Sequence, residues 1–307
     1  AFLTPGVLFE EMGFRYFGPI DGHDLDQLID TFTAVRELKT PRLVHVITQK
    51  GKGFPAGEHT EKWHALPPGH DPATGKQLKA STANPAYTAV FGKGLAELGA
   101  LDRRVVTITA AMPSGTGTGA FAKQHPARFF DVGIAEGHAV TFAAGLATRG
   151  LRPVAAIYST FLQRAYDNII HDVAIQSLPV VFCMDRAGLV GEDGETHMGL
   201  YDIAYMLAVP GMTVAAPKDG REMVALLRAG LAHADGPFCL RYPRDVAPDV
   251  VPAAGEIDPA PLGTWEVPRR GRELAILAVG TMVQPSLDAA EALAADGLDV
   301  TVVNCRY

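Results

Sequence analysis

The sequence FDVGIAEGHAVTFAA, residues 130–144, combines a short strand, a tight turn and a helix within fifteen residues. Phe129 to Val132 is apolar enough for a buried strand, and Gly133 then turns the chain. After this turn, small apolar residues recur at helical spacing, namely Val140, Ala143, Ala144 and Ala147. A strand that leads directly into a helix is typical of parallel α/β sheets, whose ligand crevice lies beyond the carboxyl ends of the strands.

Glu136 is a carboxylate among small and apolar residues at the point where the predicted helix begins, and nothing beside it in sequence neutralises its charge. An acid among apolar neighbours at a strand end is suited to proton transfer near neutral pH. The alternative is that Glu136 caps its own helix by accepting hydrogen bonds from free backbone N–H groups. This stretch alone does not favour either interpretation.

A regular alternation of strands and helices follows Asn84 and Pro85, which we take as a helix start. Amphipathic patterns predict helices at 160–177 and 219–234. Continuous apolar strands joined by helices specify a parallel sheet with both faces covered, so we predict a doubly wound α/β domain. Its expected strands are 105–109, 129–132, 152–158, 179–185, 213–216 and 238–242.

The segments on either side indicate partial α/β units. Residues 1–50 contain one helix after GPIDGHD and one buried strand, which resembles the tail of a domain. Residues 51–83 form an irregular connecting segment, 84–245 the central domain, and 246–272 a proline-rich linker without a helix or central strand. Residues 273–307 begin a further βαβ unit. We therefore expect the chain to be a piece of a longer protein.

Composition excludes several classes of protein. A net charge of −7 argues against a nucleic-acid surface, and no apolar run is long enough to span a bilayer. Cys183, Cys239 and Cys305 lie far apart without a CxxC pair, so we expect no disulfide framework and no metal site. Free cysteines fit a reducing compartment, and we predict a soluble, cytoplasmic protein.

Several chemically able residues follow predicted strands of the central domain. Tyr158 ends one strand, Arg186 and Arg244 follow two others, and the loop after Arg186 carries Asp193 and His197. Arginines that converge on one sheet edge can hold a phosphate group bidentately, so we predict a phosphorylated substrate. Each arginine alone has a simpler explanation as a surface ion pair, and only their shared strand-end position favours a binding site.

Histidines and aromatic residues leave further alternatives open. His197 and His64 lie in irregular segments that packing explains poorly, which favours proton transfer, whereas His171 lies in a predicted helix and is interpreted as structural. Phe161 either joins the core or floors a ring-binding pocket beside Tyr158. The glycine-rich residues 111–121 lack the ending of a P-loop and give only a weak phosphate signal.

Taken together, the chain resembles the 1-deoxy-D-xylulose-5-phosphate synthases, thiamine-diphosphate enzymes of the transketolase superfamily. This resemblance implies a pyrimidine-binding α/β domain and a decarboxylative condensation of pyruvate with D-glyceraldehyde 3-phosphate, which supplies isoprenoid, thiamine and pyridoxal pathways. The motifs that carry it are GPIDGHD, TQKGKGF, FDVGIAEGHAVTFAAGLA, IYSTFLQRAYDNIIHDVAIQ, DRAGLVGEDGETHMG and RYPR.

The resemblance also implies roles for individual residues. Glu136 matches the glutamate that hydrogen-bonds the cofactor's aminopyrimidine, Phe161 matches the aromatic residue stacked on that ring, and Arg164 lines the same pocket. The remaining matches complete the site that the resemblance implies. The residues that bind the acceptor's phosphate are matched by Tyr158, Arg186 and Arg244, and those near its hydroxyl and carbonyl groups by Asp193 and His197. The residues that reach the substrate side of the cofactor are matched by Lys50 and His64.

Departures from the family pattern qualify these expectations. The diphosphate-and-Mg²⁺ motif, GDG followed by asparagine, is absent, so we expect the magnesium ligands in a missing N-terminal portion on which catalysis depends. Gly137 replaces a usual glutamine, Met198 occupies an often polar position, and GEDGETH is nearer to the transketolase form. A transketolase, a 2-oxo-acid dehydrogenase β chain and a non-catalytic α/β partner module remain alternatives. We expect a homodimer.

Overall fold

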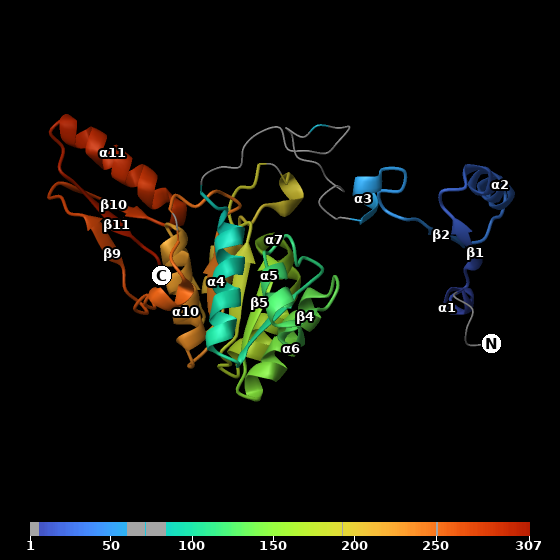
Figure 1. Cartoon of the computed structure of the whole chain (residues 1–307), viewed down its shortest axis with the longest axis horizontal. Coiled ribbons are helices and arrows are strands. Elements are labelled where there is room, and N and C mark those ends of the chain that lie inside the picture. Colours follow the sequence, from blue (N-terminus) through green and yellow to red (C-terminus); the bar gives the residue numbers. More distant parts are fainter. Residues whose placement is uncertain (1–5, 60–70, 72–83, 192, 250) are drawn as a thin grey trace. The chain divides into compact units, whose positions relative to one another are not determined.

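A computed structural model describes residues 6–59, 71, 84–191, 193–249 and 251–307 of the chain. The chain forms two compact units, Ala1–Ser81 and Thr82–Tyr307. Figure 1 colours their helices and strands along the sequence. Each unit is described by itself below.

The first unit is a small βαβ arrangement rather than the single helix and strand expected from sequence. Its parallel strands are β1 (Arg15–Asp21) and β2 (Arg42–Ile47), joined by α2 (Leu25–Arg36). Asp24 caps α2, since its Oδ1 accepts a hydrogen bond from the Gln27 N–H (3.0 Å). Strand β1 escaped prediction because glycine and proline interrupt its apolar pattern. Two short helices complete the unit, α1 (Val7–Glu11) and α3 (Pro55–His59).

The second unit contains a sheet of six parallel strands in the order β4-β3-β5-β6-β8-β7. The predicted doubly wound α/β fold is confirmed, and every predicted strand of this sheet exists within two residues of its expected ends. The strands are β3 (Val105–Thr109), β4 (Phe129–Asp131), β5 (Arg152–Tyr158), β6 (Val181–Asp185), β7 (Thr213–Ala215) and β8 (Phe238–Arg241).

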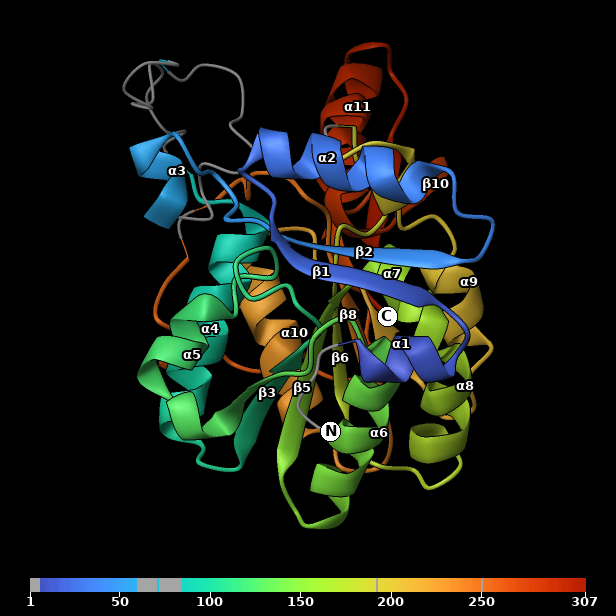
Figure 2. The same cartoon turned by 90° about the vertical axis from the view of Figure 1, so that its right-hand side faces the viewer.

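Helices cover both faces of this sheet (Figure 2). Helices α4 (Tyr87–Leu101) and α10 (Gly220–Ala232) pack on one face, and α6 (Glu136–Thr148) packs on the other. Along β5, Val154 and Ala156 contribute to the first core, whereas Ala155 and Ile157 contribute to the second. This strict alternation shows that the strand is buried on both sides.

Two expected helices differ from the prediction. The predicted helix at 160–177 is helical up to Ala174, but α, 3₁₀ and π segments follow one another in place of one regular α-helix. Its buried residues are Leu162, Ala165, Ile169 and Val173. Helix α4 begins at Tyr87 rather than beside Asn84, because the residues before it pair with the chain after β8: the Tyr87 N–H donates to Asp245 O (2.9 Å), and Ala86 forms a bridge with Val246. The interrupted segment comprises α7 (Ser159–Leu162), η3 (Gln163–Ala165), α8 (Tyr166–Asn168) and η4 (Ile169–Ala174).

The C-terminal residues form a three-stranded sheet in the order β10-β11-β9, with α11 (Val283–Ala295) packed on β11. Strand β9 (Glu266–Arg269) lies inside the predicted linker. It contains Pro268, which an edge strand tolerates. No described helix has the length and apolar character needed to cross a membrane. The remaining elements are α5 (Gly119–Gln124), η2 (Pro126–Arg128), η5 (Glu195–His197), α9 (Asp202–Leu207), η6 (Ala254–Glu256), β10 (Leu274–Ala278), η7 (Gly280–Met282) and β11 (Val300–Asn304).

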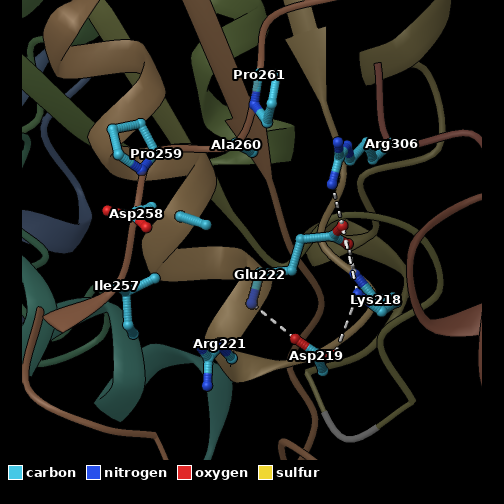
Figure 3. Close-up of a pocket in the computed structure, with 11 residues that line it drawn as sticks. Lys218, Asp219, Arg221, Glu222, Ile257, Asp258, Pro259, Ala260, Pro261 and Arg306 are labelled. Carbon is cyan, nitrogen blue, oxygen red and sulfur yellow. Dashed lines mark hydrogen bonds and ion pairs between the residues drawn. The ribbon is translucent and has the colours of Figure 1, made fainter. Parts of the chain in front are cut away.

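A buried carboxylate ties the C-terminal strands to the central sheet (Figure 3). Glu222 on α10 is 4% exposed and accepts hydrogen bonds from Asn304 Nδ2 at 2.8 and 3.1 Å. Arg306 Nη1 and Lys218 Nζ lie 3.4 and 3.5 Å from its Oε1. The pocket drawn in Figure 3 is lined by charged and apolar residues, and its Lys218, Asp219, Glu222 and Arg306 side chains are joined by ion pairs.

Truncating the central strand should be costly. Ile157→Ala removes a fully buried side chain at the centre of the second core, and we expect a loss of about 2–5 kcal/mol in the free energy of unfolding. Leu101→Ala, at a position that is 67% exposed, is the matched control and should change it by less than about 0.5 kcal/mol. Urea unfolding of both variants measures the difference, and equal losses would contradict the assigned core.

Candidate active site

The strand order reverses direction between β3 and β5, and the candidate site lies at this point. Strand β4 pairs with one edge of β3, whereas β5 returns to pair with its other edge. The loops after these strands therefore diverge and leave a crevice at the carboxyl edge of the sheet, where open α/β sheets bind ligands. Most of the residues singled out from sequence lie at or just after strand ends on this edge.

A pocket of about 280 Å³ opens in this crevice. Its walls come from the segment after β3, the start of α6 and the turns after β5. Most of its lining is apolar, with one carboxylate and one guanidinium, as is common in ligand-binding sites. The lining residues are Ala110, Ala111, Met112, Ile134, Glu136, Phe161 and Arg164.

Glu136 is the first residue of α6 and its side chain is 5% exposed. Asp131 fixes the preceding turn, since its Oδ1 accepts hydrogen bonds from the N–H groups of Ala111 (2.7 Å) and Gly133 (3.0 Å). The Glu136 carboxylate accepts no hydrogen bond from a backbone N–H of the described residues, which disfavours the capping interpretation. Arg164 Nη1 lies 3.6 Å from its Oε2, so in space the charge has a partner that the neighbouring sequence lacks.

Aromatic rings form one wall of the crevice. Tyr158, the last residue of β5, stacks on Phe161 with ring centroids 5.8 Å apart and planes 14° apart. His197 meets Phe161 edge-on at 5.2 Å and Tyr158 at 6.2 Å. Phe161 is half-buried, lines the pocket and also packs against the second core, so both interpretations of this residue stay open.

Arg186 follows β6 in a left-handed backbone conformation, with φ of 60°. Its guanidinium carbon lies 4.0 Å from the centre of the Tyr158 ring, within cation–π range. Its Nη1 donates to the carbonyl oxygen of Gly115 (2.6 Å), and its Nε donates to Asp193 Oδ2 (3.1 Å). The side chain is only 12% exposed, so Arg186 is held rigidly at the edge of the crevice.

Asp193 joins the two arginines predicted to bind phosphate. Its Oδ2 accepts from Arg186, and its Oδ1 pairs with Arg244, which follows β8. The arginines thus converge on one carboxylate. Because Asp193 already offers two oxygens to these guanidinium groups, it occupies the kind of position that an anionic ligand would take.

Two acidic residues of the same edge were not singled out from sequence. Asp185 is fully buried at the end of β6, where burial raises its pKa to about 6 against the opposing effects of Arg186 and Thr88. Asp202, also buried, accepts hydrogen bonds from Ser159 Oγ (3.1 Å) and Arg241 Nε (2.9 Å) at the stem of the loop 186–199. The sequence pattern singled out neither acid, because the contacts of Asp185 with Thr88 and of Asp202 with Ser159 and Arg241 join residues that are distant in sequence.

The glycine-rich segment 111–121 proves to be a wall of the site. A Cβ on Gly115 would lie 1.9 Å from the Tyr158 hydroxyl oxygen, so only glycine allows this approach. His171, predicted to be structural, is exposed and pairs with Asp172 (3.0 Å). Lys50 lies in a turn after β2 of the first unit, and its part in the site stays a prediction. His64 lies outside the described residues.

Comparison with known proteins agrees with this architecture. Residues 83–249 match the family model of the transketolase pyrimidine-binding domain, 1–48 that of 1-deoxy-D-xylulose-5-phosphate synthase, and 263–307 that of the transketolase C-terminal domain. The chain is 52% identical over its whole length to 1-deoxy-D-xylulose-5-phosphate synthase 1 of Geobacter sulfurreducens, and 54% identical over 99% of its length to the synthase of Aquifex aeolicus. It spans 48% of each of these relatives.

Solved structures show the same fold. A split-gene transketolase, described as an inactive β4 tetramer, is 32% identical with a TM-score of 0.64, covering 72% of this chain and 71% of that one. A transketolase from Leishmania mexicana has a TM-score of 0.62 at 23% identity, covering 74% of this chain and 35% of that one.

The sheet, its switch point and the matched domain define a protein of the transketolase-like, pyrimidine-binding class. Within that class the similarity to one group extends over the full chain. The chain belongs to the 1-deoxy-D-xylulose-5-phosphate synthase family.

Filling the space at Gly115 should disturb the site. Gly115→Ala forces Tyr158 and the stacked Arg186 to move, and we expect a loss of about 1–3 kcal/mol in the free energy of unfolding. Gly145→Ala, in α6 with no atom near the added Cβ, is the matched control and should be neutral or stabilising by up to about 1 kcal/mol. Chemical denaturation measures both, and a neutral Gly115→Ala would contradict the close contact.

Proposed function

We propose that the chain is the pyrimidine-binding part of a 1-deoxy-D-xylulose-5-phosphate synthase. The full-length protein would condense pyruvate with D-glyceraldehyde 3-phosphate, release carbon dioxide and form 1-deoxy-D-xylulose 5-phosphate. The observation that carries this proposal is the identity of 52–54% to named synthases over nearly the whole chain, combined with a buried carboxylate at the switch point. Family membership alone would support the chemistry only by analogy, whereas the position of Glu136 supports it from a specific side chain.

The pocket at Glu136 suits an aminopyrimidine ring. A flat heteroaromatic group needs an apolar slot with an aromatic face and a polar group at its edge, and Phe161, Met112 and Glu136 provide these features. When bound, thiamine diphosphate would supply a carbanion that adds to the carbonyl carbon of pyruvate. Glu136 would hold the proton of the pyrimidine ring nitrogen, and Arg164, 3.6 Å away, would keep the carboxylate oriented.

The arginine cluster suits the phosphate of the acceptor. Arg186 and Arg244 lie on one carboxylate, Asp193, so an incoming phosphate would compete with that carboxylate for the same guanidinium groups. Tyr158 borders the guanidinium of Arg186. His197 packs edge-on against Phe161 between the two sets of residues, where it could exchange a proton with the acceptor's carbonyl or hydroxyl groups.

Other parts of the protein complete the proposed site. Lys50 and His64 would reach the substrate side of the cofactor, and the ligands of Mg²⁺ would be supplied by a further portion of the full-length protein. A homodimer would cover exposed apolar side chains near the crevice, such as Ile134 and Leu189, which are 78% and 77% exposed. The three free cysteines fit a reducing compartment such as the cytoplasm.

The decisive test is a change at Glu136. In the full-length protein, Glu136→Gln keeps the size of the side chain but removes its acid function, and we expect kcat to fall by about a hundredfold or more. Formation of 1-deoxy-D-xylulose 5-phosphate from pyruvate and the aldehyde phosphate is the measurement. Glu222→Gln, an equally buried carboxylate on α10, is the matched control and should keep its rate. A Glu136→Gln variant with an unchanged rate would show that this carboxylate takes no part in catalysis, and would favour a non-catalytic role for this chain within the assembly.

The same assay separates the alternative enzymes. A transketolase would transfer a ketol group from a sugar phosphate without releasing carbon dioxide, and the 32% identity to a split-gene transketolase is the observation that keeps this alternative open. Carbon dioxide from pyruvate with the aldehyde acceptor supports the synthase, whereas ketol transfer supports transketolase.

Arg244 provides a test of the acceptor site. Arg244→Ala removes a charged hydrogen-bond donor, and we expect the KM for D-glyceraldehyde 3-phosphate to rise about tenfold to a hundredfold with little change in the KM for pyruvate. Arg221→Ala, an exposed arginine at the start of α10, is the control and should leave both constants as they are. Equal effects on both substrates would argue against a phosphate site.

A further inference from the structure

Asp185 is a fully buried carboxylate whose contacts are directed at the next residue in the chain. Its Oδ1 accepts a hydrogen bond from the Arg186 N–H (2.8 Å) and lies 3.1 Å from Arg186 Nη1. Its Oδ2 accepts a hydrogen bond from Thr88 Oγ1 on α4 (2.7 Å). Both oxygens are therefore in use, and Thr88 fixes the orientation of the carboxylate from the other side.

Arg186 needs such support because its backbone is in the left-handed region. A residue with a long side chain is disfavoured there unless its surroundings hold it, and such strain gathers at functional sites. The contacts of Asp185 reach both the backbone and the guanidinium of Arg186, whereas those of Gly115 and Asp193 reach the guanidinium alone. Arg186 Nη2 has no hydrogen-bond partner among the described residues, which leaves it able to serve a ligand.

We propose that Asp185 is a positioning residue for acceptor recognition, which acts together with Thr88 to hold Arg186 in the conformation that binds the acceptor's phosphate. The side chain of Asp185 touches no substrate and acts through Arg186. This inference rests on the proposed function, and it gives a reason for the left-handed backbone conformation of Arg186. Loss of the Asp185 carboxylate is therefore expected to weaken the reaction with the phosphorylated aldehyde more than the reaction with the unphosphorylated one.

The charged groups around Asp185 allow its protonation to be linked to the position of Arg186. Arg186 and Arg244 are the cations of the cluster and Asp193 is its other acid. Burial raises the pKa values of Tyr158, Cys183 and Tyr242, so these neighbours stay neutral. Burial also raises the pKa of Asp185 itself to about 6, and the Thr88 hydrogen bond opposes that rise. Acidification through this range therefore removes the charge that holds Arg186.

The first experiment compares two acceptors in the full-length protein. For wild type and Asp185→Asn, kcat/KM is measured with D-glyceraldehyde 3-phosphate and with unphosphorylated D-glyceraldehyde at saturating pyruvate. We expect the ratio of the two values to fall about tenfold or more in the variant, mainly through the KM of the phosphorylated acceptor. Glu222→Gln, which neutralises a buried carboxylate at the C-terminal junction, should keep the wild-type ratio.

Thr88 provides a second test if Asp185→Asn does not fold. Thr88→Val removes the donor to Asp185, so the carboxyl should protonate at a higher pH and the preference for the phosphorylated acceptor should fade at a higher pH than in wild type. Reading each profile relative to wild type cancels the ionisation of the substrate's own phosphate. Thr88→Ser retains the hydroxyl and should restore the wild-type profile.

The outcomes separate the two proposals. A wild-type protein that forms no 1-deoxy-D-xylulose 5-phosphate would overturn the proposed function. An active wild type whose acceptor ratio survives Asp185→Asn, or whose pH profile is unmoved by Thr88→Val, would overturn the positioning role alone. Equal losses with both acceptors would also overturn it, since a general structural defect does not distinguish a phosphate from a hydroxyl.

Discussion

The shared direction of the six central strands is the constraint on which the site depends. Parallel strands bring all of their carboxyl ends to one edge, and the reversal of strand order at β3 parts the loops that leave that edge. Residues separated by more than a hundred positions, such as Glu136 and Arg244, are thereby placed along one sheet edge. Two apolar cores, one on each face, keep the strands rigid and leave the edge free to carry charge.

Charge at this edge is balanced before any ligand is present. Asp193 pairs with the guanidinium groups of Arg186 and Arg244, and the buried Asp185 also pairs with that of Arg186. Such mutual neutralisation reduces the cost of holding arginines in a partly buried crevice. It also holds the two guanidinium groups in a fixed arrangement around one carboxylate.

The elements that could be predicted correctly from sequence are those determined by a local pattern of apolar residues. The continuous apolar runs at 105–109 and 152–158 gave β3 and β5 with correct ends, because a strand buried on both faces leaves an unbroken hydrophobic signal. Strands β1 and β9 were missed, since proline and glycine obscure short edge-type strands. The start of α4 was misplaced because the chain after β8 pairs with the residues before the helix, which no local pattern reveals.

The distinction between local patterns and contacts of distant residues applies to the candidate site and to the C-terminal junction as well. Strand-end positions led to Glu136, Arg186 and Arg244 as candidates, whereas the contact of Thr88 with Asp185 joins residues 97 positions apart and leaves no local pattern. At the junction, Glu222 draws its donors from Lys218 on one side and from Asn304 and Arg306 on the other. A chimaera that exchanged the C-terminal strands with those of a homologue lacking Asn304 and Arg306 would leave the buried Glu222 carboxylate with the donors of Lys218 but without those of the C-terminal strands. Evolutionary recombination at this boundary is therefore constrained to move acid and donors together.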